Sequence, residues 1–232
     1  MSLLTIVQDA SDRLGLPRPS VVSAANDATS RALLGLAQQE GRELSRRHPW
    51  QALKTEHTFP TVDAQEDYDL PDDFDRIMNE TMFDRTSRRR VLGPLSDEEW
   101  QLTKATLVTR VNPAFRIRGN QILITPTPTG VVTIAFEYVS NEWCQSDTPE
   151  DQSEWMADSD TAKLDEELFK LGLVWRFKKS KGLEYAEDFT TYEREVTQAI
   201  MRDGGRPRIS TGKAVVDRIP VAPQVPETLV FS

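Results

Sequence analysis

The chain has 232 residues and a formal net charge of −9, and 38% of its residues are hydrophobic. This composition is typical of a globular protein, and the negative charge argues against a protein that grips nucleic acid along its whole surface. The single cysteine excludes an internal disulfide and suits a reducing cytoplasm, and no apolar run is long enough to span a bilayer.

The charge is unevenly distributed along the sequence. Residues 63–75 and 137–167 are acidic, whereas residues 206–218 are basic. We expect no signal peptide, because residues 1–9 lack a basic start and contain Asp9.

The first fifty residues predict two helices. The apolar stripe of the first comprises Leu3, Ile6, Val7, Ala10 and Leu14. Gly15 and Pro17 follow it in the order that helix ends prefer. The second helix is expected to end at His48, because Pro49 disfavours helix at the preceding residue. Its small residues, with Gly41, predict that another helix approaches closely.

The next segment changes to an alternating pattern that is typical of strands. Residues 53–59 predict the first strand, and residues 115–118 and 121–124 predict a hairpin turning at Gly119-Asn120. Residues 132–138 alternate again. We expect these strands to form one antiparallel sheet.

Three shorter segments lie among these strands. Residues 68–77 are interpreted as a turn leading into a short helical piece, with Pro71 near its start. Residues 80–84 predict a further strand. Ser96 and Glu99 have the spacing of a capping box, which predicts a helix beginning there.

Residues 160–204 predict two helices back to back, after an acidic segment (141–160) that is interpreted as a loop. The first helix ends in three lysines before Gly182, as the helix dipole and left-handed end residues favour. Its apolar residues are Leu164, Leu168, Leu171, Leu173, Val174, Trp175 and Phe177. They occupy more than one face, so we expect cover on several sides. The second helix ends at Gly204-Gly205.

The predicted fold class is α+β: a helical bundle of N- and C-terminal helices, an inserted antiparallel sheet and an extended C-terminal arm. The expected divisions are 1–50 for the N-terminal helices, 51–145 for the sheet region, 160–204 for the helical hairpin and 205–232 for the arm. Neither end of the chain can bury its helix stripes alone, so both must meet.

The arm is basic at its start, rich in proline and yet apolar. A solvated disordered tail is not usually that apolar, which indicates a segment that lies extended on a partner or on its own domain. We predict that it binds a neighbouring subunit or another protein. The residues expected to make the contact are Arg206, Arg208, Ile209, Val215, Val216, Ile219, Val221, Val225, Leu229, Val230 and Phe231.

The residues that most often carry chemistry do not form a recognisable site. His48 is interpreted as a helix-end residue, His57 as a packed core residue and Cys144 as inert, because acidic neighbours raise a thiol pKa. The four aspartates at 69, 72, 73 and 75 lack the spacing of a calcium loop. The sequence therefore predicts no catalytic residue, metal or cofactor.

Arg88, Arg89 and Arg90 form a basic triplet that is expected in a loop. Three loop arginines favour a subunit contact or a phosphate contact about equally.

Several segments together resemble the head-to-tail adaptor (connector) proteins of tailed bacteriophages, including the upper tail-tube or gatekeeper type. The segments are Arg46-Arg-His-Pro-Trp-Gln51, Thr55-Glu-His-Thr-Phe59, Tyr68-Asp-Leu-Pro-Asp-Asp-Phe-Asp-Arg76, Leu123-Ile-Thr-Pro-Thr-Pro128, Phe136-Glu-Tyr138, Leu171-Gly-Leu-Val-Trp-Arg176 and Lys181-Gly-Leu-Glu-Tyr185. They span residues 27–202, and their order carries the resemblance. The last thirty residues match no family known to us.

The resemblance implies a structural virion protein without catalytic residues or cofactors. It implies a ring of twelve subunits that joins the portal to the tail or nozzle proteins and continues the DNA channel. Genomic DNA would pass without specific binding, which an acidic lining favours by repelling phosphates. The resemblance places the protein at the head–tail interface, with assembly in the bacterial cytoplasm and no membrane partner.

Two other hypotheses stay open. One is a DNA-binding packaging accessory protein that uses the arginine triplet and the basic start of the arm. The other is a small hydrolase with a carboxylate-bound metal at Asp72 and Asp73.

Overall fold

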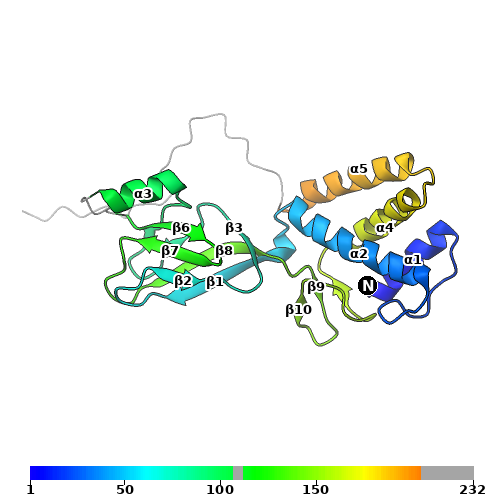
Figure 1. Cartoon of the computed structure of the whole chain (residues 1–232), viewed down its shortest axis with the longest axis horizontal. Helices are drawn as coiled ribbons and strands as arrows, with labels where there is room; N and C mark the ends of the chain where they lie inside the picture. Colours follow the sequence, from blue (N-terminus) through cyan, green and yellow to red (C-terminus); the bar gives the residue numbers. More distant parts are fainter. Residues whose placement is uncertain (107–111, 205–232) are drawn as a thin grey trace, which may run out of the picture.

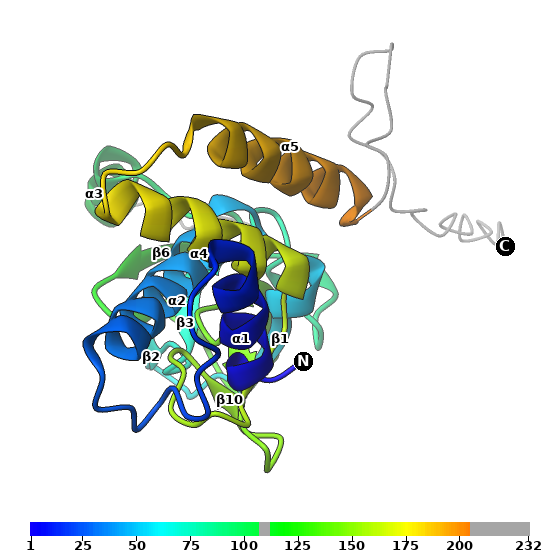
Figure 2. The same ribbon diagram turned by 90° about the vertical axis from the view of Figure 1, so that its right-hand side faces the viewer.

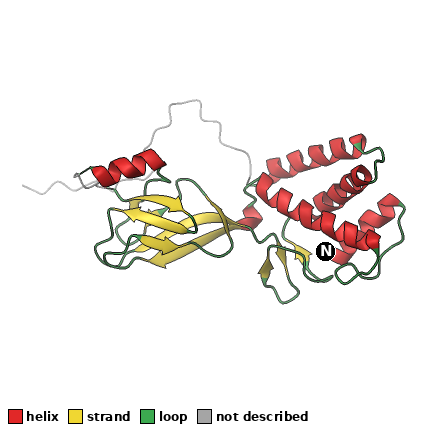
Figure 3. Ribbon diagram, in the orientation of Figure 1, coloured by secondary structure: helices red, strands yellow, loops and turns green. Residues whose placement is uncertain are grey.

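The computed structural model describes residues 1–106 and 112–204, which form a helical part and a sheet part side by side along the long axis (Figure 1). Figure 3 shows that most helices gather in one part and most strands in the other. The helices are α1 (Leu3–Leu14), α2 (Ala28–Arg47), α3 (Asp97–Ala105), α4 (Glu166–Ser180) and α5 (Ala186–Arg202), with a short 3-10 helix η1 (Gln51–Leu53). The mixed α+β class is confirmed.

Local signals at both ends of α1, at the end of α2 and at the start of α3 are confirmed. The Ser2 side chain caps α1, and Gly15 ends it with a left-handed φ of 67°. Asp27 caps α2, and His48 follows its last residue in extended conformation. The predicted capping box at the start of α3 is present, with Ser96 and Glu99 bonding each other's backbone N–H groups.

Helix α4 is the centre of the helical part, and it contacts α1, α2 and α5. In Figure 2, α4 lies between α5 on one side and the pair α1 and α2 on the other. Nine of its residues between Leu168 and Phe177 are buried, as the apolar residues on more than one face predicted. The four helices share one hydrophobic core, to which Trp143 and Trp155 also belong.

A buried charge network joins α2, α4 and α5. Glu40 is fully buried, and its carboxylate accepts hydrogen bonds from Arg176 Nε at 2.5 Å and from Tyr192 Oη at 2.6 Å. Arg176 Nη2 also donates to Glu43 at 2.7 Å. Burial raises the pKa of Glu40 despite the nearby Arg176 charge. A Cβ at Gly172 would lie 2.3 Å from the Glu40 carboxyl carbon, so this approach requires glycine.

Gly41 also permits a close approach, but the approaching group is a tryptophan ring and not the second helix that we expected. A Cβ at Gly41 of α2 would lie 2.3 Å from the ring of Trp143. Trp143 is buried and lies edge-on to Trp155 and tilted against Phe169. The small residue therefore admits an indole from the segment after the sheet.

The strands form three antiparallel sheets, so the single predicted sheet is wrong. The first has the order β1-β8-β4-β5 with β3 also on β8, the second has β2-β7-β6, and a small third has β10-β9-β11. The strands are β1 (Lys54–Pro60), β2 (Asp67–Asp69), β3 (Phe74–Ile77), β4 (Phe83–Asp84), β5 (Arg89–Arg90), β6 (Ala114–Arg118), β7 (Gln121–Thr125), β8 (Thr133–Ser140), β9 (Cys144–Gln145), β10 (Asp151–Gln152) and β11 (Thr161–Ala162).

The predicted hairpin of β6 and β7 is present, but β8 leaves it to pair with β1 over the whole length of that strand. The reason is that β8 contributes side chains to both hydrophobic cores. Ile134, Phe136 and Tyr138 join the core between the two larger sheets, whereas Val139 joins the helical core. The central position of β8 in the first sheet lets it contact both cores, whereas Glu137 on its other face stays exposed.

Two other sequence interpretations are corrected. Residues 68–77 form the end of β2, a turn and β3 rather than a helical piece, because Phe74 and Ile77 pack onto the core of the sheet part. Residues 141–160 contain β9 and β10, although they were expected to be a loop. Although the segment is acidic, it contains Trp143, Cys144 and Trp155, which are buried in the helical core.

The end of α5 is attached to the start of the sheet part. Asp203 Oδ2 accepts a hydrogen bond from the Gln51 backbone N–H at 2.9 Å and lies 3.3 Å from His48 Nε2. Gly204 follows beside the Gln51 side chain. The last described residue therefore lies close to the beginning of β1.

Candidate functional site

His48 and Cys144 take the structural positions that the sequence indicated, whereas His57 lies at the border of the sheet core and not within it. His48 lies at the end of α2, and the half-buried His57 stacks on Phe59 and meets Phe136 edge-on. Burial lowers the pKa of His57. Cys144 is fully buried, and burial raises the pKa of its thiol to about 12. A thiol with that pKa is a poor nucleophile at neutral pH.

The four aspartates at 69, 72, 73 and 75 do not converge on a common point. Asp69 accepts a hydrogen bond from Gln121, and Asp75 pairs with Arg76. The Tyr138 hydroxyl donates one bifurcated hydrogen bond to the two carboxylate oxygens of Asp73, at 2.8 and 2.9 Å. Across the described residues, no group of three or more His, Cys, Asp or Glu side chains is arranged to hold a metal ion.

The Tyr138–Asp73 contact is a structural bond that sequence reasoning missed, because it joins residues far apart in the chain. Tyr138→Phe is expected to lower the free energy of unfolding by about 1.5–3 kcal/mol, the usual range for a bond to a charged group. Urea unfolding of the variant measures this loss. The matched change Tyr185→Phe, at an exposed ring, should cost less than about 0.5 kcal/mol. Equal losses in both variants would contradict the assignment.

The arginine triplet lies only partly in a loop, which corrects the expectation. Arg89 and Arg90 form β5, held by β4, which in turn pairs with the central β8. Arg88 precedes them in a left-handed conformation, with a φ of 55°. Arg90 Nη2 lies 3.2 Å from Glu80, whereas Arg88 and Arg89 are exposed. The structure therefore leaves two of the three arginines available to a partner.

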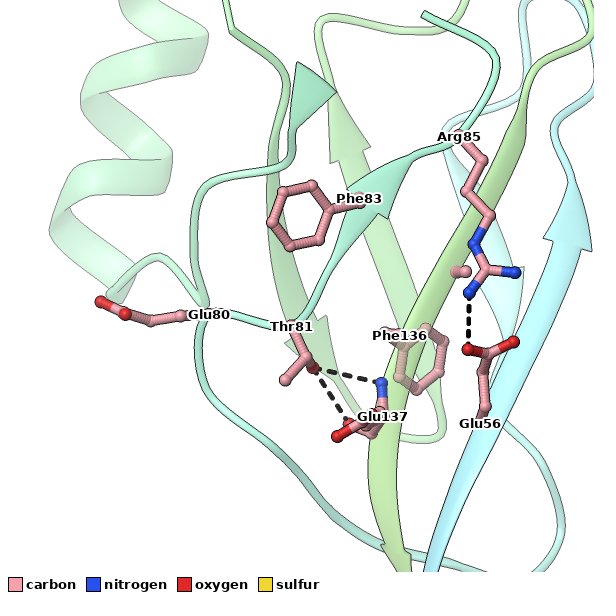
Figure 4. Close-up of a pocket in the computed structure, with 8 residues that line it drawn as sticks. Glu56, Glu80, Thr81, Phe83, Arg85, Phe136 and Glu137 are labelled. Atoms are coloured by element: carbon pink, nitrogen blue, oxygen red, sulfur yellow. Dashed lines mark hydrogen bonds and ion pairs between the residues drawn. The ribbon is translucent and has the colours of Figure 1, made fainter. Parts of the chain in front are cut away.

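A cleft lies on the face of the first sheet that points away from the second sheet (Figure 4). Ala135 and Phe83 are opposite each other on β8 and β4 and line it. Glu56 and Glu137 are also directly opposite each other, on β1 and β8. Arg85 donates to Glu56 at 2.5 Å, and the Thr81 hydroxyl bonds the backbone of Glu137. The cleft carries excess negative charge and lacks a nucleophile paired with a base.

The predicted contact residues of the arm, from Arg206 to Phe231, lie outside the described residues. Gly204, the last described residue before the arm, lies beside Gln51 at the junction of the two parts. None of the helices in ranges 1–106 and 112–204 combines the length and hydrophobicity that crossing a membrane requires.

The geometry thus provides surfaces for contact and no assembled catalytic group among the described residues. A comparison with curated proteins finds no match. The family described as SU10 adaptor protein matches residues 1–216, which include every helix and strand of the described residues. This agrees with the resemblance to phage head-to-tail adaptors that the sequence segments carry. The chain belongs to the SU10 adaptor protein family.

Proposed function

We propose that the protein is a structural component of the virion that assembles as a ring of twelve subunits between the portal and the tail. The family match over residues 1–216 is the observation that carries this proposal. In this role the ring continues the DNA channel, and the subunits assemble in the host cytoplasm before they join the particle. Adaptors work by contact, so the function needs no catalytic group.

The acidic character of the chain supports a role in which DNA passes without being held. The net charge is −9, and the exposed sheet face carries Glu56 and Glu137 opposite each other. Carboxylates repel phosphates, and binding to DNA normally requires an excess of Lys and Arg at the interface. Genomic DNA therefore moves through the ring without specific contacts.

The C-terminal arm supplies the contact with a neighbouring subunit or the portal. Its sequence is apolar, and it starts beside the junction of the helical and sheet parts. We therefore divide the subunit into residues 1–50, 51–145, 160–204 and 205–232. The first three segments make the body of the subunit, and the fourth links it to its partner.

Light scattering and negative-stain imaging of the purified protein, alone and mixed with its portal ring, test the proposal. We expect a particle with twelve times the mass of the 26.3 kDa chain, at least in the presence of the portal. A chain truncated after Gly205 should remain folded and lose docking. A full-length protein that stays monomeric with the portal present would overturn the proposal.

The alternative is a packaging accessory protein that binds DNA through Arg88 and Arg89, which are both exposed. Binding of a DNA duplex at low salt, lost in an Arg88→Ala, Arg89→Ala variant, would favour it. The adaptor proposal predicts no such binding.

A further inference from the structure

Strand β1 forms an edge of the first sheet, because it pairs with β8 and with no other described strand (Figure 1). It has seven residues, which is long for an exposed edge, and Thr55, Glu56 and Thr58 are exposed. Edge strands of this kind offer unpaired backbone groups to another strand, and proteins usually shorten or cover them.

The register identifies the backbone groups that are open. The Thr61 N–H donates to Val132 O, so Thr61 and Val132 form a hydrogen-bonded pair. Hydrogen-bonded pairs alternate along an antiparallel ladder, so every second residue from Thr61 back to His57 also bonds to β8. The residues between them turn their groups outward. The N–H and C=O groups of Glu56 and Thr58 therefore point away from β8. Among the described strands, β1 has no second neighbour to which these four groups could bond.

The arm contains a segment that suits such an edge. Residues 213–219 form its longest stretch without proline or glycine, and they include Val215, Val216 and Ile219. β-Branched residues favour strands. The stretch has seven residues, as β1 does. Lys213 and Arg218 also complement the negative charge of Glu56.

The position at which the arm begins indicates whether it binds β1 of its own subunit or β1 of a neighbouring subunit. All paired strands in the described residues are antiparallel. An antiparallel addition to its own β1 would require residues 205–212 to run from Gln51 past Pro60. That path is about 30 Å, from the rises of η1 and β1. The nine Cα–Cα steps from Gly204 to Lys213 cover about 30–32 Å only at full extension, so addition to its own β1 would leave the linker no slack. A neighbouring subunit imposes no such limit.

We propose that residues 213–219 of one subunit add as an antiparallel strand to the open edge of β1 in a second copy of this chain. The contact is head-to-tail, with a different surface used on each side, and repetition of such a contact closes a ring. The inference rests on the proposed ring and specifies its subunit interface.

Disulfide trapping tests this contact directly. Protein carrying Thr58→Cys is mixed with protein carrying Val216→Cys, assembled on the portal ring and oxidised mildly. Cys144 stays reduced in both, because it is buried and its thiol pKa is about 12. We expect a covalent mixed dimer on a non-reducing gel, at least ten times more abundant than with Val230→Cys in place of Val216→Cys.

The outcomes distinguish failure of the strand proposal from failure of the ring proposal. Rings that form without the mixed disulfide would overturn the strand proposal and leave the ring standing. A disulfide found only within a single chain carrying both cysteines would show that the arm binds its own β1, which also overturns it. Absence of any ring with unmodified protein would count against the adaptor proposal instead.

A backbone variant provides an independent test. Thr58→Pro removes an N–H group that points away from β8, so the β1–β8 pairing keeps its hydrogen bonds. Thr58→Ala is the matched control, since it retains that N–H. We expect the alanine variant to assemble normally and the proline variant to need at least tenfold more protein for assembly, with equal circular dichroism. Equal assembly of the two would contradict the proposal.

Discussion

Arg176→Met is expected to destabilise the protein by about 3–5 kcal/mol at neutral pH, the usual cost of removing one partner of a buried ion pair. Glu40 is fully buried, and without Arg176 its charge keeps only the hydrogen bond from Tyr192. Methionine has a volume and shape close to those of the arginine stem, so packing changes little. Urea unfolding at pH 7 measures the loss.

The pH dependence identifies the cause of this loss. Burial already raises the pKa of Glu40 above its unfolded value, and the variant raises it further. The penalty is absent below the unfolded pKa and grows as the pH rises towards the folded pKa. The difference between the variant and the parent protein should therefore shrink from pH 7 to about pH 4. The control Arg194→Met, at an exposed side chain paired with Glu195, should cost less than about 0.5 kcal/mol. A loss below about 1 kcal/mol for Arg176→Met would show that the network carries little stability.

Gly41→Ala is expected to cost about 3 kcal/mol, at the upper end of the range for overpacking a core. The new Cβ would lie 2.3–2.5 Å from three ring atoms of Trp143. That ring cannot retreat easily, because it is 1% exposed and contacts Trp155 and Phe169. Thermal unfolding measures the effect, and the near-UV circular dichroism of Trp143 should change with it.

Gly35→Ala is the matched control, because it makes the same change in the same helix. A Cβ at Gly35 has no atom within 4 Å. Alanine there should stabilise the protein by about 0.5–1 kcal/mol, since it reduces the freedom of the unfolded chain. The two substitutions are thus expected to have opposite signs. A gain of stability at both positions would mean that helix propensity, and not contact with Trp143, decides the outcome.

The sequence was sufficient at the helix ends whose signal is local, whereas the local signal at Pro71 failed, because a turn into β3 forms there. Ser96 and Glu99 lie three residues apart, and the bonds that they make are within one helical turn. Gly15 ends α1 through its own left-handed conformation. The apolar residues of α4 also indicated correctly that the helix is covered on several sides, since helical spacing alone assigns them to different faces.

Strand partners were not predictable in this way. The alternation in residues 132–138 identified β8, but the pattern is the same whether the strand pairs with β7 or with β1. The choice of partner depends on contacts of β8 with two cores, one shared with the second sheet and one in the helical part. Glu40 was missed for a related reason. A glutamate on a helix usually faces water, and its partners are 136 and 152 residues away.

The insertion of the sheet part between α2 and α4 determines the order in which the chain can fold as it is synthesised. Glu40 emerges from the ribosome 136 residues before Arg176, a delay of roughly 7–27 s at 5–20 residues per second. During this interval α1 and α2 have no α4 to pack against, whereas β1 to β8 emerge as one uninterrupted segment. The sheet part can therefore fold while the nascent chain is still growing. The helical part, although it contains the first residues made, must wait until translation has passed α4.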